Sequence, residues 1–166
     1  MITAETIRER GHHEGEFADT ITLDEDLRHR RRMAMVSDGG IAFVLNLSDA
    51  RLLRDGDGIV LDDGRVIEVK AKPEPLYAVR GRDPIHLLHL AWHLGNRHLA
   101  AAIEADRLLI RRDRVIREMV EGLGGLVEEI EAPFDPAGGA YAHQHAHGHA
   151  SPHHHGHGHH DGHSHG

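Results

Sequence analysis

The sequence contains no cysteine, and this absence excludes two kinds of site. Without cysteine there are no disulfides and no thiolate metal ligands. Cu(I) is disfavoured as a bound ion, because it prefers sulfur ligands. Aromatic residues are also scarce, with one Trp, two Tyr and three Phe. Surfaces that stack nucleobases need aromatic side chains, so a single-strand nucleic-acid binder is disfavoured as well.

Long apolar stretches are missing too. No run of 18 apolar residues could form a transmembrane helix, and no N-terminal apolar segment resembles a signal peptide. The cytoplasm is therefore the expected location. The formal net charge is −8 with histidine neutral. Proteins of this size that bind nucleic acid are usually basic, so the charge also argues against that class.

Histidine is the residue that the sequence has in excess, at 19 of 166 positions. The last 26 residues, 141–166, hold twelve of them and no Leu, Ile, Val or Phe. Such a segment cannot bury a core, so we expect residues 136–166 to form a disordered tail. Neutral imidazole ligates Zn, Cu and Ni. The candidate metal ligands in the tail are His143, His145, His147, His149, His153, His154, His155, His157, His159, His160, His163 and His165.

The His-rich tail also fits a purification tag or a store of metal ions. A tag usually has six consecutive histidines behind a linker, whereas the longest run here is three, at residues 153–155. A protein that only stores or buffers metal ions would need nothing beyond such a tail. The composition therefore predicts metal binding but does not reveal its purpose.

Residues 1–72 have the pattern of a small all-β domain. Short apolar or alternating runs at 20–23, 33–36 and 41–47 are separated by Gly/Asp turns. Two further runs, at 59–61 and 66–69, flank the tripeptide Asp-Asp-Gly at 62–64, which predicts a β-hairpin. A sandwich or a barrel-like module is the expected architecture.

The pattern changes after Pro73 and Pro75, which predict a linker because proline lacks a backbone N–H. Beyond them we expect strands at 76–80, 99–104, 107–110 and 126–130, and helices at 84–94 and 112–122. Asp83 is the expected N-cap of the first helix and Gly95 its terminator. The order β-α-β-β-α-β predicts a ferredoxin-like domain over residues 73–135. The fold class expected for the whole chain is therefore α+β.

The first of these helices carries histidines and apolar residues on adjacent faces. A lone histidine on a helix is more often structural or solvated than a metal ligand. We therefore expect His86 and His89 to be structural or solvated. One stripe of the helix consists of three histidines, His86, His89 and His93. The neighbouring stripe consists of three apolar residues, Ile85, Leu88 and Trp92, and is expected to face the sheet.

His93 and His98 are the candidate metal ligands of the folded part, because both lie within one helix-to-strand turn. Two imidazoles alone bind an ion weakly. Further ligands must come from the tail, or from a second subunit related by a two-fold axis. The remaining histidines, His12, His13 and His29, lie near loops and charged residues and are expected to be solvated.

A basic cluster, RHRRR, occupies residues 28–32. Its arginines fit exposed charges along a strand, or a patch that binds an acidic protein partner. Binding to nucleic acid or phosphate fits less well, because the rest of the chain is acidic and poor in aromatic residues. The candidate partner-binding residues are Arg28, Arg30, Arg31 and Arg32.

Several motifs together resemble the UreE family of urease accessory nickel chaperones. The central one is HLGNRH at residues 93–98, preceded by Asp-Pro at 83–84. It is followed by Ala-Pro-Phe at 132–134, Gly-Gly-Ala-Tyr at 138–141 and the His-rich end. The N-terminal half adds RDGD at 54–57 and DDGRV at 62–66. The resemblance thus covers both halves of the chain.

The resemblance implies a protein that binds Ni(II) as cargo and delivers it to the urease apoprotein complex, together with a urease accessory GTPase. It implies an N-terminal domain that engages partners and a homodimer formed by the C-terminal domains. His98 would pair with its symmetry mate around one Ni(II), tail histidines would complete the site, and His93 would be a secondary ligand. Imidazole chemistry alone also allows Zn(II) or Cu(II).

One segment departs from part of the family. Some members carry two more histidines before the second helix, where this sequence has Arg111, Arg112 and Arg114. Arginine stays protonated and cannot ligate a metal, so any peripheral site built on those histidines is expected to be missing here. Enzyme classes are disfavoured as well, because the sequence has no nucleophile elbow, phosphate loop or HExxH helix.

Overall fold

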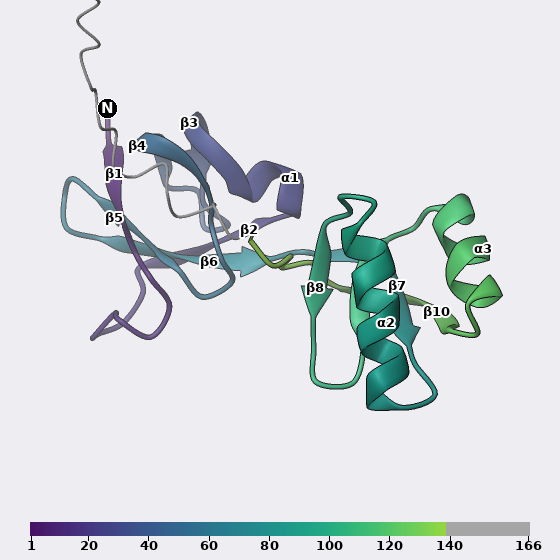
Figure 1. Ribbon diagram of the computed structural model, residues 1–166. Helices are drawn as coiled ribbons and strands as arrows, with labels where there is room; N and C mark the ends of the chain where they lie inside the picture. The colour runs from purple at the N-terminus through teal and green to yellow at the C-terminus, as the bar shows by residue number, and fades with distance from the viewer. Residues whose placement is uncertain (139–166) are drawn as a thin grey trace, which may run out of the picture.

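The computed structural model of the protein describes residues 1–138, which form two sheets and three helices. The N-terminal lobe contains β1 (Thr3–Arg8), β2 (Asp19–Leu23), α1 (Glu25–Arg28), β3 (His29–Val36), β4 (Ala42–Leu52), β5 (Gly58–Leu61) and β6 (Val66–Ala71). The C-terminal lobe contains β7 (Pro73–Arg80), α2 (Pro84–Gly95), β8 (Ala101–Ile103), β9 (Leu108–Arg111), α3 (Arg114–Gly122) and β10 (Leu126–Pro133). Figure 1 shows the two lobes side by side, joined by the strands β6 and β7 and by the end of β10. The predicted α+β class is confirmed.

The N-terminal lobe is one six-stranded sheet in the order β2-β6-β5-β1-β4-β3. Its alternating strands direct Leu45, Ile59 and Ile67 into a single core, where all three are fully buried. The predicted hairpin is confirmed, since β5 and β6 pair antiparallel. Gly64 in its turn has φ 89°, a conformation that glycine adopts at little cost. Strand β1 and the short helix α1 were not predicted from the sequence.

The two edges of this sheet meet at the turn that follows β3. Asp38 bridges them: its N–H donates to the carbonyl of Thr20 at 2.8 Å, and its carboxylate accepts the hydroxyl protons of Thr20 at 2.6 Å and Thr22 at 2.9 Å. These hydrogen bonds lower the pKa of Asp38 below its ordinary value of 3.8, with the Thr20 hydroxyl as the largest cause. Hydrogen bonds from β2 to this turn therefore close the sheet into a barrel-like form.

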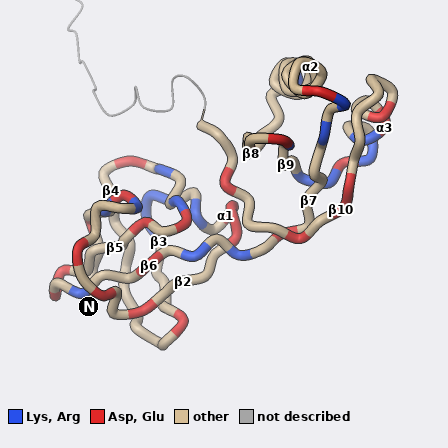
Figure 2. Tube along the Cα trace, turned by 90° about the horizontal axis from the view of Figure 1, so that it is seen from below, with Lys and Arg blue, Asp and Glu red and all other residues tan. Residues whose placement is uncertain are grey.

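The C-terminal lobe has the element order β-α-β-β-α-β and an antiparallel sheet in the order β10-β7-β9-β8. Both helices lie on one face of this sheet, as the views of Figures 1 and 2 agree. On that face Leu90 and Leu94 of α2 and Val120 of α3 form one core with the sheet. Phe134, just after β10, is fully buried against the other face. Both faces of the sheet are thus covered.

The predicted N-cap of α2 is confirmed, but its predicted end is not. The Asp83 carboxylate accepts the N–H of His86 at 2.7 Å, and Pro84 occupies the first turn. Gly95 lies inside the helix, and the C-cap is Asn96. The left-handed residue that redirects the chain is His98, with φ 56°. The helix therefore ends one residue later than predicted, and the left-handed residue after it is His98 rather than Gly95.

The predicted orientation of α2 was also wrong. Ile85, Leu88 and Trp92 do not face the sheet but are 65%, 64% and 66% exposed. The sheet-facing positions are Leu90 and Leu94, which are 1% exposed. Apolar residues surround most of this helix, so two phases fit its pattern equally well, and the sequence alone does not favour either.

The predicted linker at Pro73 and Pro75 is instead the start of β7. Residues 73–75 pair with Glu131, Ala132 and Pro133 of β10. Strand β9 pairs with β7 only from Leu76 onward, so the two prolines face no strand on that side. None of the helices in residues 1–138 has the length and apolar character needed to cross a bilayer.

Candidate metal centre

His98 stands on the turn that connects α2 to β8. Its N–H donates to the carbonyl of Gly95 at 3.0 Å, and the N–H of Arg97 donates to Leu94 at 3.1 Å, so the turn continues the hydrogen bonding of the helix. The positive φ of His98 is uncommon for a residue other than glycine, although histidine is enriched there. His98 is exposed, and no side chain within residues 1–138 hydrogen-bonds its ring. The ring is therefore free to bind a ligand from outside the lobe.

His93 occupies the last turn of α2 and is half-buried. Its ring meets the indole of Trp92 edge-on, with centroids 5.2 Å apart and planes at 80°. The structure thus places the two predicted ligands at the same end of α2, His93 on the helix and His98 on the turn. The contact with Trp92 restricts His93 more than anything restricts His98.

His86 has a structural role. It is 7% exposed, and both ring nitrogens are satisfied. The N–H of Arg82 donates to Nδ1 at 3.1 Å, so Nε2 carries the proton and donates to the carbonyl of Leu123 at 2.9 Å. The ring therefore ties the start of α2 to the end of α3 and is unavailable to a metal. His89, on the same helix, is exposed.

The histidines of the N-terminal lobe differ from one another. His12 and His29 are exposed, as expected. His13 is half-buried and stacks on Phe17, with ring centroids 4.5 Å apart. Its Nδ1 accepts from Arg8 at 3.2 Å, and its Nε2 lies 3.4 Å from the carbonyl of Glu16. The expectation of a solvated His13 was wrong, because the ring helps to close the loop between β1 and β2.

No group of three or more His, Cys, Asp or Glu side chains within residues 1–138 is arranged to hold a metal ion. Nickel and zinc need several ligands to bind tightly. At the turn between α2 and β8, one folded copy therefore offers the exposed imidazole of His98, with His93 nearby. The tail histidines, from His143 to His165, lie outside the described residues. A complete centre requires them or a second copy of the chain.

The basic cluster divides between the interior and the surface. Arg28 is the last residue of α1 and is fully buried, so its predicted role in partner binding was wrong. Arg31 and Arg32 are exposed, and Arg30 is half-buried. These three residues lie on β3, an edge strand of the sheet. Charged side chains on an edge also oppose unwanted strand pairing.

An ion-pair cluster next to the end of β10 was missed entirely. The Asp135 carboxylate lies 2.7 Å from Arg54 and 3.6 Å from Arg28. Arg28 also donates to the carbonyl of Leu53 at 3.0 Å and to that of Phe134. Arg54 donates to the carbonyl of Pro136 at 2.7 Å. Residues 134–136, which lead into the tail, are therefore fixed to the N-terminal lobe.

Comparison with protein families matches the chain almost from end to end. Residues 3–72 match the model of the UreE urease accessory protein N-terminal domain. Residues 74–165 match the model of the C-terminal domain of the same family. The boundary between the two matches coincides with the start of β7.

Individual relatives carry the same description. The urease accessory protein UreE of Chelativorans sp. (strain BNC1) is 69% identical over 128 residues, covering 76% of this chain and 81% of that protein. The protein of the same name from Rhodopseudomonas palustris (strain HaA2) is 60% identical over 145 residues, covering 87% and 67%. The one from Rhizobium meliloti (strain 1021) is 52% identical over 128 residues, covering 77% and 82%.

Proposed function

Because this chain belongs to the UreE family of urease accessory proteins, we propose that it is a nickel metallochaperone that delivers Ni(II) to the urease assembly machinery. The family consists of accessory proteins, so the chain is not an enzyme and takes part in the maturation of urease. The observation that carries the proposal is His98. It is an exposed imidazole on a turn held by backbone hydrogen bonds, and no described side chain hydrogen-bonds its ring.

The proposed nickel site combines three sources of ligand. His98 and the His98 of a second copy form its fixed part, and imidazoles of the tail complete the coordination. His93 is a secondary ligand at the same end of α2. In support, residues 1–138 of one copy hold no group of three ligating side chains. Arg111, Arg112 and Arg114, before and at the start of α3, add no ligand, because arginine stays protonated.

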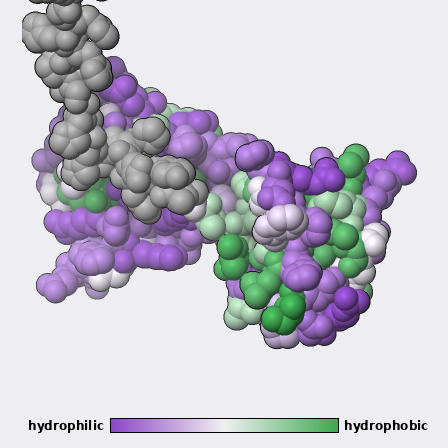
Figure 3. Space-filling view, in the orientation of Figure 1, coloured by the Kyte–Doolittle hydropathy of each residue, from purple (hydrophilic) through white to green (hydrophobic). Residues whose placement is uncertain are grey.

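We assign the C-terminal lobe to the ferredoxin-like fold and propose that it forms the homodimer. The strand order, with the first and third strands of the lobe central, supports this assignment. The exposed apolar stripe of α2, formed by Ile85, Leu88 and Trp92, supports a contact between copies. Figure 3 shows hydrophobic residues gathered on the α2 side of this lobe. Apolar surface of this kind is typical of an interface.

The N-terminal lobe is the proposed site of partner binding, through Arg30, Arg31 and Arg32 on β3. Its partners would be the urease accessory GTPase and the urease apoprotein complex. The proposed organisation is a partner-binding domain at 1–72, a metal-binding and dimerisation domain at 73–135 and a metal-binding tail at 136–166. The cytoplasmic location stays a prediction, as does binding of Zn(II) or Cu(II).

Delivery would proceed by ligand exchange. Ligands of a partner replace tail imidazoles one at a time, so the ion is never released into solution. Only neutral imidazole binds a metal, so nickel affinity should fall as the pH falls through about 6.5, the ordinary pKa of histidine. Storage of nickel is the alternative, and it would require the tail but not His98.

His98→Ala and the matched exposed variant His89→Ala test this proposal. Isothermal titration with Ni(II) should show one tight site per dimer that His98→Ala weakens at least tenfold and His89→Ala leaves unchanged. A chain ending at residue 141 should lose most bound ions yet retain a tight site. Urease activation should fail with His98→Ala. Full activation by that variant, with loss of activation only when the tail is removed, would favour storage and contradict delivery from His98.

A further inference from the structure

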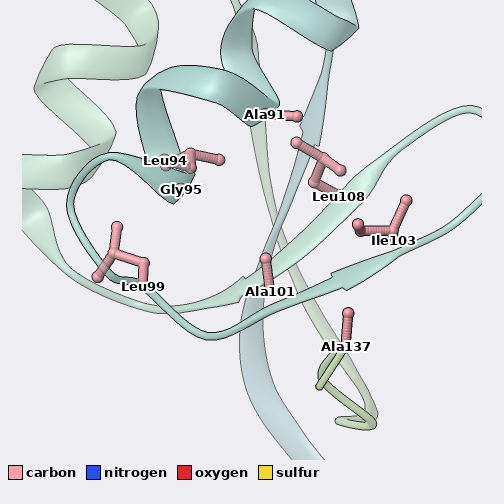
Figure 4. A pocket seen from close by; sticks show the side chains of 8 residues that line it. All are labelled: Ala91, Leu94, Gly95, Leu99, Ala101, Ile103, Leu108 and Ala137. Atoms are coloured by element: carbon pink, nitrogen blue, oxygen red, sulfur yellow. The ribbon is translucent and has the colours of Figure 1, made fainter. Parts of the chain in front are cut away.

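The C-terminal lobe has an apolar hollow of about 160 Å³ beside the turn that carries His98. Figure 4 shows side chains from α2, from the turn and from β8 directed around it. Its walls include Ala91, Leu99 and Ile103, and Ala137 closes one side. The hollow is separate from the exposed stripe of α2, because Ile85, Leu88 and Trp92 do not line it.

The chain passes this hollow at a fixed point. Phe134 is fully buried, and its carbonyl accepts a hydrogen bond from the buried Arg28. The carbonyl of Pro136 accepts from Arg54 at 2.7 Å. The N–H of Ala137 then donates to the carbonyl of Ala101 on β8 at 2.9 Å. The tail therefore starts from the rim of the hollow, at a position fixed by both lobes.

We propose that the side chain of Tyr141 occupies this hollow. Tyr141 follows Ala137 by four positions, a reach of up to about 14 Å for an extended chain. An apolar cavity of about 150 Å³ holds a benzene molecule, so the space fits one aromatic ring. Tyr141 is the only large apolar side chain after Phe134, apart from the imidazoles. Because the hollow opens to solvent, its hydroxyl group remains in water.

Docking of Tyr141 selects the tail histidine that reaches the nickel site, and this consequence rests on the proposed function. Gly95 and Leu99 line the hollow, and His98 lies between them on the turn. His143 follows Tyr141 by two residues, so in an extended chain its side chain points to the same side. Tyr141 would be a positioning residue that raises the local concentration of the His143 imidazole around His98.

Nuclear magnetic resonance of the metal-free, full-length chain tests the docking without any nickel. Nuclear Overhauser contacts are expected from the Tyr141 ring to the methyl groups of Leu99 and Ile103. Tyr141→Ala should shift these methyl resonances and leave those of Leu45, in the N-terminal lobe, in place. A mixture of labelled and unlabelled chains separates contacts within a copy from contacts between copies. Missing contacts, or contacts only from Tyr141 or Trp92 of another copy, would overturn the proposal.

Nickel titration of the same variants tests the consequence. Tyr141→Ala and His143→Ala should each weaken the tight site roughly tenfold, because either change lowers the local concentration of the same ligand. Tyr141→Phe, which keeps the ring, and His89→Ala, at an exposed position of α2 outside the proposed site, should stay within about twofold of the natural chain. If the natural chain shows the docking contacts but Tyr141→Ala binds Ni(II) as tightly as the natural chain, the positioning role is refuted. In that case, loss of the tight site in His98→Ala would still support a nickel site at His98. The positioning role of Tyr141 and the nickel site at His98 can therefore fail independently.

Discussion

Histidines of similar sequence surroundings have different roles in this protein. His86 and His98 lie near opposite ends of α2, yet one is 7% exposed with both nitrogens bonded and the other is exposed. The difference depends on the neighbouring backbone. The carbonyl of Leu123 at the end of α3 accepts from His86, whereas His98 follows the last helical turn, and its ring has no hydrogen-bond partner within residues 1–138. Only the exposed ring can exchange ligands.

His86→Ala is expected to lower the free energy of unfolding by about 2–3 kcal/mol, since it leaves the carbonyl of Leu123 and the N–H of Arg82 unpaired in a buried site. The matched variant His89→Ala, at an exposed position of the same helix, should change it by less than about 0.5 kcal/mol. Urea denaturation followed by circular dichroism measures both. Equal stability of the two variants would show that His86 is not structural.

The residues of the candidate site were predictable in part. The turn with His93 and His98 could be recognised, because its motif is local in sequence. The burial of Arg28 could not, because its partners are the carbonyls of Leu53 and Phe134, 25 and 106 residues away. The motif RHRRR does not show that its first arginine is buried and that the other three lie on a strand, because it contains no information on contacts so distant in the sequence.

At the scale of elements, local signals predicted well and long-range choices did not. The hairpin of β5 and β6 and the N-cap of α2 depend on neighbouring residues and were correct. The phase of α2 depends on which apolar side the rest of the lobe covers. Whether residues 73–75 form a strand or a linker depends on pairing with β10, nearly sixty residues later in the chain. Such choices are made by tertiary packing and are absent from the local pattern.

The exposed stripe of α2 gives a prediction at this scale. Leu88→Glu should convert the proposed dimer into a monomer, because a carboxylate would be buried without a partner at the interface. Val115→Glu is the matched control, since Val115 is 66% exposed on α3, a different helix of the same lobe. Sedimentation velocity of metal-free protein should show a monomer for the first variant and a dimer for the second. A dimeric Leu88→Glu variant would place the interface elsewhere.

The two lobes are held together by charged groups rather than by a shared apolar core. Arg111 of β9 lies 2.5 Å from Glu25 and 3.4 Å from Asp26, both in α1. Glu74 of β7 accepts the N–H of Glu25 at 3.0 Å. Figure 2 shows charged residues of both signs along the segments that join the lobes. The short helix α1, absent from the sequence prediction, thus connects the N-terminal lobe to the second sheet.

Asp135 forms the other connection, and its loss should affect the whole molecule. Asp135→Asn keeps the shape of the side chain but removes the negative charge beside the buried Arg28, at 3.6 Å. We expect the free energy of unfolding to fall by roughly 2–3 kcal/mol. This is at the low end of the usual cost of breaking a buried ion pair, because Asp135 is itself 26% exposed. The lobes should also become less tightly coupled, because Arg54 loses the same partner.

Glu131→Gln is the matched control for this change. It removes one carboxylate charge, but Glu131 is 62% exposed and lies 3.9 Å from Arg112 within the same lobe, so it should cost less than about 0.5 kcal/mol. Backbone relaxation measured by nuclear magnetic resonance gives a rotational correlation time for each lobe. The two times should agree in the natural chain and in Glu131→Gln, and should differ in Asp135→Asn. If they stay equal in Asp135→Asn, the contacts of Arg111 with α1 are sufficient to hold the lobes in one orientation, and Asp135 serves only to fix the start of the tail.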